Sequence, residues 1–268
     1  GGQKESYNDE ARVHSTLLYR SLIFAGLHGC GVATAALSFV RLMACGTSRT
    51  SPRLLSLRST AFQIVAAVAI PSSLSIGYLI WASMASERFF ERREREREWW
   101  EMQNYPEGER EEMVEIYEQQ GLSTEDANVV VDIFQKDPDV FLNLMMVEEL
   151  GYSRFGMPNG VEVFFRGSVP AMLSHMVCIF APIVPLLVLS HHKSPSSSSL
   201  PSSQHIAIPV SEAVLVTQTL VLSVLQARLL YGAYAAISNT IPVVAANAAW
   251  VGVLYTVSRF ASKVFMTL

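Results

Sequence analysis

Long apolar stretches are the feature that most constrains what this chain can fold into. Each is about as long as the roughly 20 apolar residues needed to cross the hydrocarbon core of a bilayer. They cover approximately residues 17–45, 61–84, 167–190, 206–230 and 233–258. Charged residues make up only 16% of the chain, against about 25% in a typical soluble protein. A soluble helical core rarely contains five such runs, so we predict an all-α integral membrane protein with five transmembrane helices.

The acidic residues are gathered in one segment. Residues 87–162 hold 20 of the 24 acidic residues, and such an asymmetry separates a polar acidic module from an apolar remainder. We therefore divide the chain into residues 1–86 with the first two membrane helices, a small acidic helical domain at 87–162, and residues 163–268 with the last three membrane helices. No nucleophile–base pair or phosphate loop indicates an enzyme. The acidic module disfavours a nucleic-acid partner.

Helix-breaking residues divide the acidic module. Its first helix continues the second membrane span and is expected to break at Pro106 and Gly108. A second helix is predicted over about residues 109–120, with Gly121 as its stop. "STED", beginning at Ser123, is a capping-box pattern that starts a third helix.

A fourth helix is predicted over about residues 140–150, ending at Gly151. The module, which opens with a long polar helix continuous with the second membrane span, is thus expected to be all-helical and small.

Glutamates in the first two of these helices have the spacing of a shared helix face. Glu98 and Glu101 are three residues apart, as are Glu109 and Glu112, and residues three apart lie on the same side of a helix. The turn "NYPEG" lets the two helices fold back, so that the pairs can face each other. Gathered carboxylates repel one another, and a divalent cation supplies the missing counter-charge. This spacing predicts a cation site.

The last short helix contributes Met145, Met146 and Glu149 to the same candidate site. All-oxygen sites suit Mg²⁺, Ca²⁺ or Mn²⁺, and a soft thioether shifts the preference toward a transition metal, with Fe²⁺ or Mn²⁺ fitting mixed carboxylate–thioether ligation. A second interpretation stays open. Alternating Glu and Arg often form a solvated helix face with local ion pairs, and methionines often fill a core.

Other metal-binding side chains have simpler interpretations. His191 and His192 lie in a Ser/Pro-rich segment that we expect to be a flexible loop. Cys30, Cys45 and Cys178 lie within or beside apolar spans. They are expected to be small buried hydrophobic residues, with no disulfide framework or zinc site.

The run "EREWWEMQNYPEGEREEMVEIYEQQGLSTEDANVVVDIF", together with "MMVEELG", resembles the cytosolic metal-binding domain of the vacuolar iron transporter family. In that family the domain is inserted between the second and third of five transmembrane helices. The apolar segments "FAPIVPLL" and "AANAAWVGVLYTVSRFASKVF" resemble its third and last helices. The family's two E-x-x-E pairs and its Met-Met-Glu motif match Glu98, Glu101, Glu109, Glu112, Met145, Met146 and Glu149.

The resemblance implies a homodimer whose helices line a central pathway through the lipid bilayer. Such a protein would move Fe²⁺ or Mn²⁺ from the cytosol into a vacuole-like organelle in exchange for protons. The acidic domain would capture the metal ion, which could be Fe²⁺, Mn²⁺ or Zn²⁺, at the cytosolic side.

The chain departs from the family's pattern inside the membrane. The family's first helix carries a metal-ligating Asp-Gly where "GLHGCG" has His28, and its second helix carries Met and Glu where "SIGYLIW" has Ile76 and Ile80. Intramembrane ionisable residues are costly and are kept mainly for function. His28 could bind a cation when neutral, or it could be a buried histidine hydrogen-bonded to a neighbouring helix.

Two functions therefore remain open. The chain is either a working transporter with His28 in its pathway, or a transport-inactive family member. The second would serve as a structural subunit of a larger membrane complex or as a membrane-tethered metal-binding module.

Overall fold

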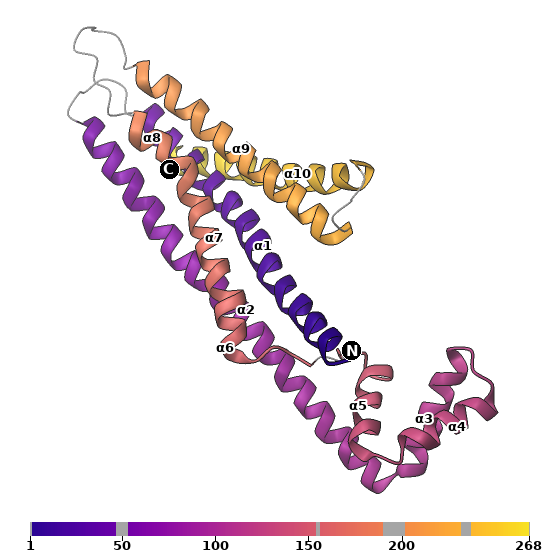
Figure 1. Cartoon of the computed structure of the whole chain (residues 1–268). Helices are drawn as coiled ribbons and strands as arrows, with labels where there is room; N and C mark the ends of the chain where they lie inside the picture. The colour runs from indigo at the N-terminus through magenta and orange to yellow at the C-terminus, as the bar shows by residue number, and fades with distance from the viewer. Residues whose placement is uncertain (1, 47–52, 154–155, 190–201, 232–236, 268) are drawn as a thin grey trace. The chain divides into compact units, whose positions relative to one another are not determined.

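The computed structural model describes most of the chain, and its described residues form helices with no strand among them (Figure 1). The described ranges are residues 2–46, 53–153, 156–189, 202–231 and 237–267. Five stretches within these helices are long and apolar enough to cross a membrane: Leu17–Val40, Phe62–Asn104, Gly160–Ile183, Pro209–Tyr231 and Ile237–Phe260. The prediction of an all-α integral membrane protein is confirmed.

The chain folds as two compact units. One comprises Gly1–Trp81 with Val161–Leu268, and the other is Ala82–Gly160. We call them the membrane unit and the acidic unit. The acidic unit begins and ends a few residues before the predicted domain at 87–162. The predicted loop with His191 and His192 lies outside the described residues, and so does the side chain of Cys45.

Helix α1 (Gly2–Gly46) is the element around which the membrane unit packs. It contacts α7 (Val169–Phe180), α9 (Ser202–Tyr231) and α10 (Ile237–Thr267). Side chains of the membrane part of α2 (Arg53–Asn104) join the same core, where α2, α1 and the end of the third span meet. The residues of this cluster are Ala36, Val65, Ala69, Ile179 and Ile183. Two alanines and three β-branched residues make up this cluster, and the partly buried side chains of Val32, Leu37, Phe180 and Leu187 pack against it.

The third span is built from several short pieces. Helix α6 (Gly160–Val163) leads into a π-helical turn, η1 (Phe164–Ser168), and then into α7. After α7 come a 3₁₀ turn, η2 (Ala181–Ile183), and α8 (Val184–Leu189). Because Pro182 lacks a backbone N–H, an α-helical bond is missing where the helix tightens into the 3₁₀ turn.

The acidic unit begins with the second half of α2 and continues through α3 (Pro106–Gln119), α4 (Thr124–Phe134) and α5 (Pro138–Glu148). Helix α2 ends at Asn104 and α3 begins at Pro106, where a missing N–H costs no hydrogen bond. Gly108 lies inside α3, so its predicted role as a helix breaker is wrong. One non-helical residue and the proline are sufficient to separate the two helices.

The helix ends downstream agree with the turn residues seen in the sequence. Gly121 after α3 and Gly151 after α5 have φ values of 105° and 69°, in the left-handed region that glycine adopts without steric cost. At the start of α4, the Ser123 hydroxyl oxygen accepts a hydrogen bond from the Asp126 N–H at 3.1 Å. The hydroxyl also donates to a carboxylate oxygen of Asp126 at 2.8 Å.

A small apolar core holds α3, α4 and α5 together. Its buried members are Met113, Val114, Tyr117, Ala127, Val131, Phe141 and Met145. Burying each larger apolar side chain stabilises a fold by about 1.5–3 kcal/mol. Arg110 of α3 adds a polar contact to α4, donating to Asp132 at 2.9 Å and to Asn128 at 2.7 Å.

Candidate metal centre

Five carboxylates of the acidic unit form one continuous cluster. Oxygens of Glu98, Glu101 and Glu109 lie within 4.8 Å of one another, and so do oxygens of Glu109, Glu112 and Glu149. Glu109 belongs to both groups and links them. The two E-x-x-E pairs and Glu149 are thus brought together as their spacing predicted.

Helix ends position this cluster. Only Tyr105 separates α2 from α3, and its N–H donates to the Glu101 carbonyl oxygen at 2.7 Å. This tight turn brings the pair Glu98 and Glu101 close to the pair Glu109 and Glu112. Glu149 sits at the C-cap of α5, where its N–H donates to the Met145 carbonyl oxygen at 3.0 Å.

Three carboxylate oxygens in the cluster are buried without a hydrogen-bond partner in the described part of the chain. They are the Oε2 atoms of Glu98, Glu109 and Glu149, one from each of three helices or helix ends. The Glu98 residue is fully buried, and Glu109 is 6% exposed. An unsatisfied buried polar atom costs about 1–3 kcal/mol, and more when it is charged. Three such oxygens in one place fit the donor set of a divalent cation.

Burial and mutual repulsion alter the acid–base chemistry of two of these residues. Burial raises the pKa of Glu109 to about 7, with further contributions from the nearby charges of Glu98 and Glu112. Burial also raises the pKa of Glu149 to about 7, again with Glu98 and Glu112 adding to the effect, while Arg97 opposes it. Without a cation these carboxyls therefore hold protons near neutral pH, and a cation would displace them.

The alternative interpretation, a solvated helix face with local ion pairs, holds for the residues of α2 next to Glu98. Arg97 pairs with Glu94 at 2.7 Å and reaches Glu98 Oε1 at 2.6 Å. The Arg97 side chain is 49% exposed, whereas that of Glu98 is 1% exposed. One helix therefore presents an ion-paired face to solvent and a carboxylate face to the cluster.

The methionines occupy the interior of the acidic unit. Met145 belongs to the apolar core, and Met146 is 1% exposed and lines a separate cavity with Arg95, Asn143 and Tyr152. Both positions agree with a packing role. Ligation of a metal ion by their sulfur atoms stays a prediction.

His28 lies in α1 of the membrane unit and is hydrogen-bonded to a neighbouring helix. Its Nδ1 is 2.8 Å from Nε2 of His175 on α7, although the His28 side chain is exposed and not buried as one interpretation had it. His175 was missed in the sequence. The signal was an ionisable residue in the middle of the third apolar span. Ile76 and Ile80 are half-buried and place no ligand atom in the membrane unit.

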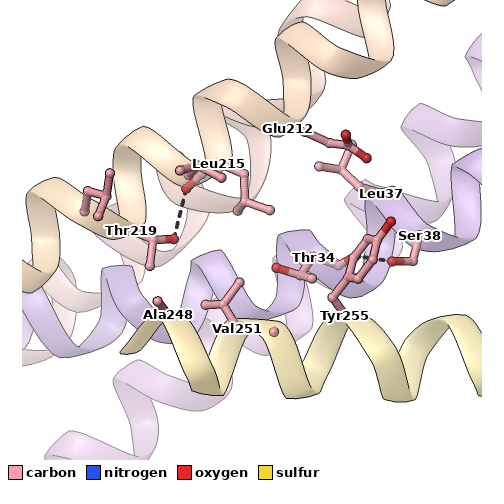
Figure 2. Close-up of a pocket in the computed structure, with 12 residues that line it drawn as sticks. Thr34, Leu37, Ser38, Glu212, Leu215, Thr219, Ala248, Val251 and Tyr255 are labelled. Atoms are coloured by element: carbon pink, nitrogen blue, oxygen red, sulfur yellow. Dashed lines mark hydrogen bonds between the residues drawn. The ribbon is translucent and has the colours of Figure 1, made fainter. Parts of the chain in front are cut away.

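The membrane unit also contains a cavity between α1, α9 and α10, with a volume of about 350 Å³ (Figure 2). Its walls are mostly apolar, although Glu212 lies on one side. The Ser38 hydroxyl donates to the Thr34 carbonyl oxygen at 2.9 Å, and Thr219 donates to the Leu215 carbonyl oxygen at 2.9 Å. Because these hydroxyls donate to their own helices, the cavity is less suited to a metal ion than the acidic cluster.

Five membrane-length helices and a partly buried carboxylate cluster define an integral membrane protein with an acidic domain that could hold a metal ion. The model of the VIT family matches residues 55–259, which is most of the chain. The chain belongs to the VIT family, and the identification made from the sequence is confirmed.

Two curated relatives are similar over part of their length. The chain is 46% identical over 83 residues to a vacuolar iron transporter of Toxoplasma gondii (strain ATCC 50861 / VEG), covering 31% of this chain and 28% of the relative. It is 37% identical over 81 residues to a vacuolar iron transporter of Plasmodium falciparum (isolate 3D7), covering 30% of each. The chain thus spans less than a third of the length of these relatives.

Proposed function

We propose that this protein carries Fe²⁺ or Mn²⁺ out of the cytosol across an organelle membrane, and that its acidic unit captures the ion. The observation that supports this most directly is the set of unpartnered oxygens on Glu98, Glu109 and Glu149. Family membership and the names of the relatives support a divalent metal ion as cargo. The cluster is the place where the ion is held before it moves.

We further propose that transport is coupled to protons and that the protein works as a homodimer in a vacuole-like membrane. The pKa values of Glu109 and Glu149, both about 7, support the exchange of protons for metal at the capture site. The dimer follows from the family resemblance.

A second function is favoured by one feature of the membrane unit. Ile76 and Ile80 occupy positions where the family resemblance implies a thioether and a carboxylate. A chain without these ligands could have lost transport and kept metal capture, serving as a subunit of a larger membrane complex or as a tethered metal-binding module.

Metal capture is tested with the full-length protein in detergent by isothermal titration with Fe²⁺ under anaerobic conditions, Mn²⁺ and Zn²⁺. We expect Glu109→Gln combined with Glu149→Gln to weaken binding at least tenfold, because it removes two anionic ligands. Glu115→Gln is the matched control, since Glu115 is an exposed residue of the same helix α3. If the wild-type protein binds none of these ions, the capture site does not exist.

Transport is tested with the same proteins in liposomes that contain a metal-sensing dye. Flux above that of empty vesicles, reduced in the double variant and kept in Glu115→Gln, is expected for a transporter. Flux equal to that of empty vesicles, with binding intact, would favour the transport-inactive family member.

A further inference from the structure

Two histidines and a serine from three membrane helices form one hydrogen-bonded chain. Nδ1 of His28 on α1 is 2.8 Å from Nε2 of His175 on α7, and Nδ1 of His175 is 2.9 Å from Oγ of Ser73 on α2. His175 and Ser73 are fully buried, while His28 is exposed. The chain of polar groups therefore runs from the interior of the membrane unit to its surface.

Close packing of α1 against α7 creates this contact. A Cβ atom on Gly29 would lie 2.7 Å from the His175 carbonyl oxygen and 3.2 Å from the His175 Cα. Only a residue without a side chain permits this approach. The two imidazole rings, one on each helix, consequently meet at their nitrogen-bearing edges, with centroids 5.0 Å apart and an interplanar angle of 23°.

The Ser73 contact fixes which nitrogen of His175 faces His28. A histidine that binds a metal usually donates its other ring N–H to a nearby oxygen, which holds the ring in place. When Nδ1 of His175 donates to Ser73 Oγ, its Nε2 carries a lone pair directed at His28. When the hydrogen of His28 is on its outer Nε2, its Nδ1 carries a second lone pair directed at the same point.

The two converging nitrogens have nearly the separation that a metal ion needs. A cation about 2.1 Å from each nitrogen in tetrahedral geometry needs them roughly 3.4 Å apart. The observed 2.8 Å therefore has to widen by about half an ångström. The His28 ring can supply this movement because it is exposed, while His175 stays held by Ser73.

We propose that His28 and His175 form a two-imidazole site for a transition-metal cation inside the membrane unit, with Ser73 as the residue that orients His175. The cation takes the place of the hydrogen bond between the two rings, and each neutral ring then keeps its single hydrogen on its other nitrogen, Nε2 of His28 and Nδ1 of His175. The remaining positions of the cation open toward the exposed side of His28. The proposal rests on the proposed function in taking divalent metal ions as the ligand class.

The ligand type sets the metal preference of this site. Imidazole suits Fe²⁺, Co²⁺ and Zn²⁺, whereas carboxylate and carbonyl oxygens suit Mn²⁺, Mg²⁺ and Ca²⁺. A two-histidine site therefore binds Fe²⁺ more tightly than Mn²⁺, so it favours Fe²⁺ of the two cargo ions proposed above. The membrane unit acts as the more selective of the two sites.

Co²⁺ is the probe for the test, because nitrogen ligation in a low-coordinate site gives it a distinctive visible absorption. The full-length protein carries Glu98→Gln, Glu109→Gln and Glu149→Gln, so that the acidic cluster does not contribute. We expect this protein to bind one Co²⁺ with nitrogen-type absorption, and to bind Mn²⁺ at least tenfold more weakly.

Adding His28→Gln or His175→Gln should abolish the absorption. Ser73→Ala should weaken Co²⁺ binding about 10- to 100-fold, as for other residues that orient a metal ligand. Ser72→Ala is the matched control, since the Ser72 hydroxyl donates to the Val68 carbonyl oxygen of its own helix. Because His28 is exposed, His28→Gln should leave folding intact, which gel filtration verifies.

Unchanged Co²⁺ absorption in His28→Gln, or equal affinities for Co²⁺ and Mn²⁺, would overturn the proposal. The measurement needs neither transport nor the acidic cluster. A protein that shows no metal flux but loses Co²⁺ absorption with His28→Gln would contradict the proposed transport and support this site.

Discussion

Glu109 and Glu149 are partly buried and lie among other carboxylates. Protons and metal ions therefore compete for these two carboxyls in the same pH range. Each carboxyl has its pKa raised to about 7 by burial first and by Glu98 and Glu112 next. Below that pH a cation would have to displace protons to bind, and above it the two carboxyls are already ionised. The metal affinity of the cluster should therefore fall steeply as the medium becomes acidic.

This competition predicts proton release on metal binding. Titration of Zn²⁺ into the full-length protein at pH 6, in buffers of different ionisation enthalpy, should show more protons released per ion than at pH 8.5. Glu109→Gln with Glu149→Gln should remove the difference. Equal proton release at the two pH values would contradict the raised pKa values.

The carboxylate cluster could be foreseen at the residue level because its determinants are local. A spacing of three residues places Glu98 with Glu101 and Glu109 with Glu112 in any helix. One turn then brings the pairs together. The pairing of His28 with His175 could not be foreseen, because it depends on which faces of α1 and α7 meet, and no local spacing encodes that. The role of Gly108 was misjudged because glycine is tolerated within the first turn of a helix that proline has already started.

Among the helices, the contact between α1 and α7 depends on Gly29, where the backbone of α7 leaves no room for a side chain. Gly29→Ala places a methyl group 2.7 Å from a backbone oxygen of α7, so the helices must separate. We expect a loss of about 1–3 kcal/mol in the free energy of unfolding, as in other overpacked interiors. The midpoint of thermal unfolding measures it.

Gly252→Ala in α10 is the control, because a Cβ atom there meets nothing within 4 Å. It should not lower the midpoint and should raise it slightly, because alanine is favoured over glycine inside a helix by about 0.5–1 kcal/mol. A Gly29→Ala protein as stable as Gly252→Ala would show that α1 and α7 can accommodate the methyl group without moving apart.

For the whole molecule, the two raised pKa values make the stability of the acidic unit depend on pH in an unusual direction. Glutamate in an unfolded chain ionises near its ordinary pKa of 4.5, whereas Glu109 and Glu149 in the folded protein hold their protons up to about pH 7. Between these values the unfolded state releases more protons than the folded state. The folded state therefore loses stability as pH rises through this window.

We expect amides of residues 82–160 to exchange hydrogen faster at pH 7.5 than at pH 5, after correction for intrinsic rates, in the metal-free full-length protein. Saturating Zn²⁺ should reverse the trend, because the ion neutralises the ionised cluster. If the hydrogen-exchange protection of these amides does not depend on pH in the metal-free protein, the carboxylate cluster is solvated and its pKa values are not raised.

For the whole molecule, the sequence predicted the class of protein well and the arrangement of its helices poorly. Hydropathy and the concentration of acidic residues predicted the membrane spans and the acidic helices, because both depend on composition over a window. The short pieces of the third span were not foreseen. The turn at Phe164–Ser168 depends on how that span packs against α1, and hydropathy averages over it.

That π-helical turn at Phe164–Ser168 sets the rotational position of everything after it in the span. It holds one residue more per hydrogen-bonded turn than an α-helix, and one residue rotates a helix by about 100°. His175 and Cys178 follow the turn, so the extra residue helps to decide that they face α1. A single insertion or deletion there would change the chemistry of the membrane interior without replacing any side chain that lines it. A relative without the wide turn is aligned correctly with this chain only if a one-residue gap is placed at that point.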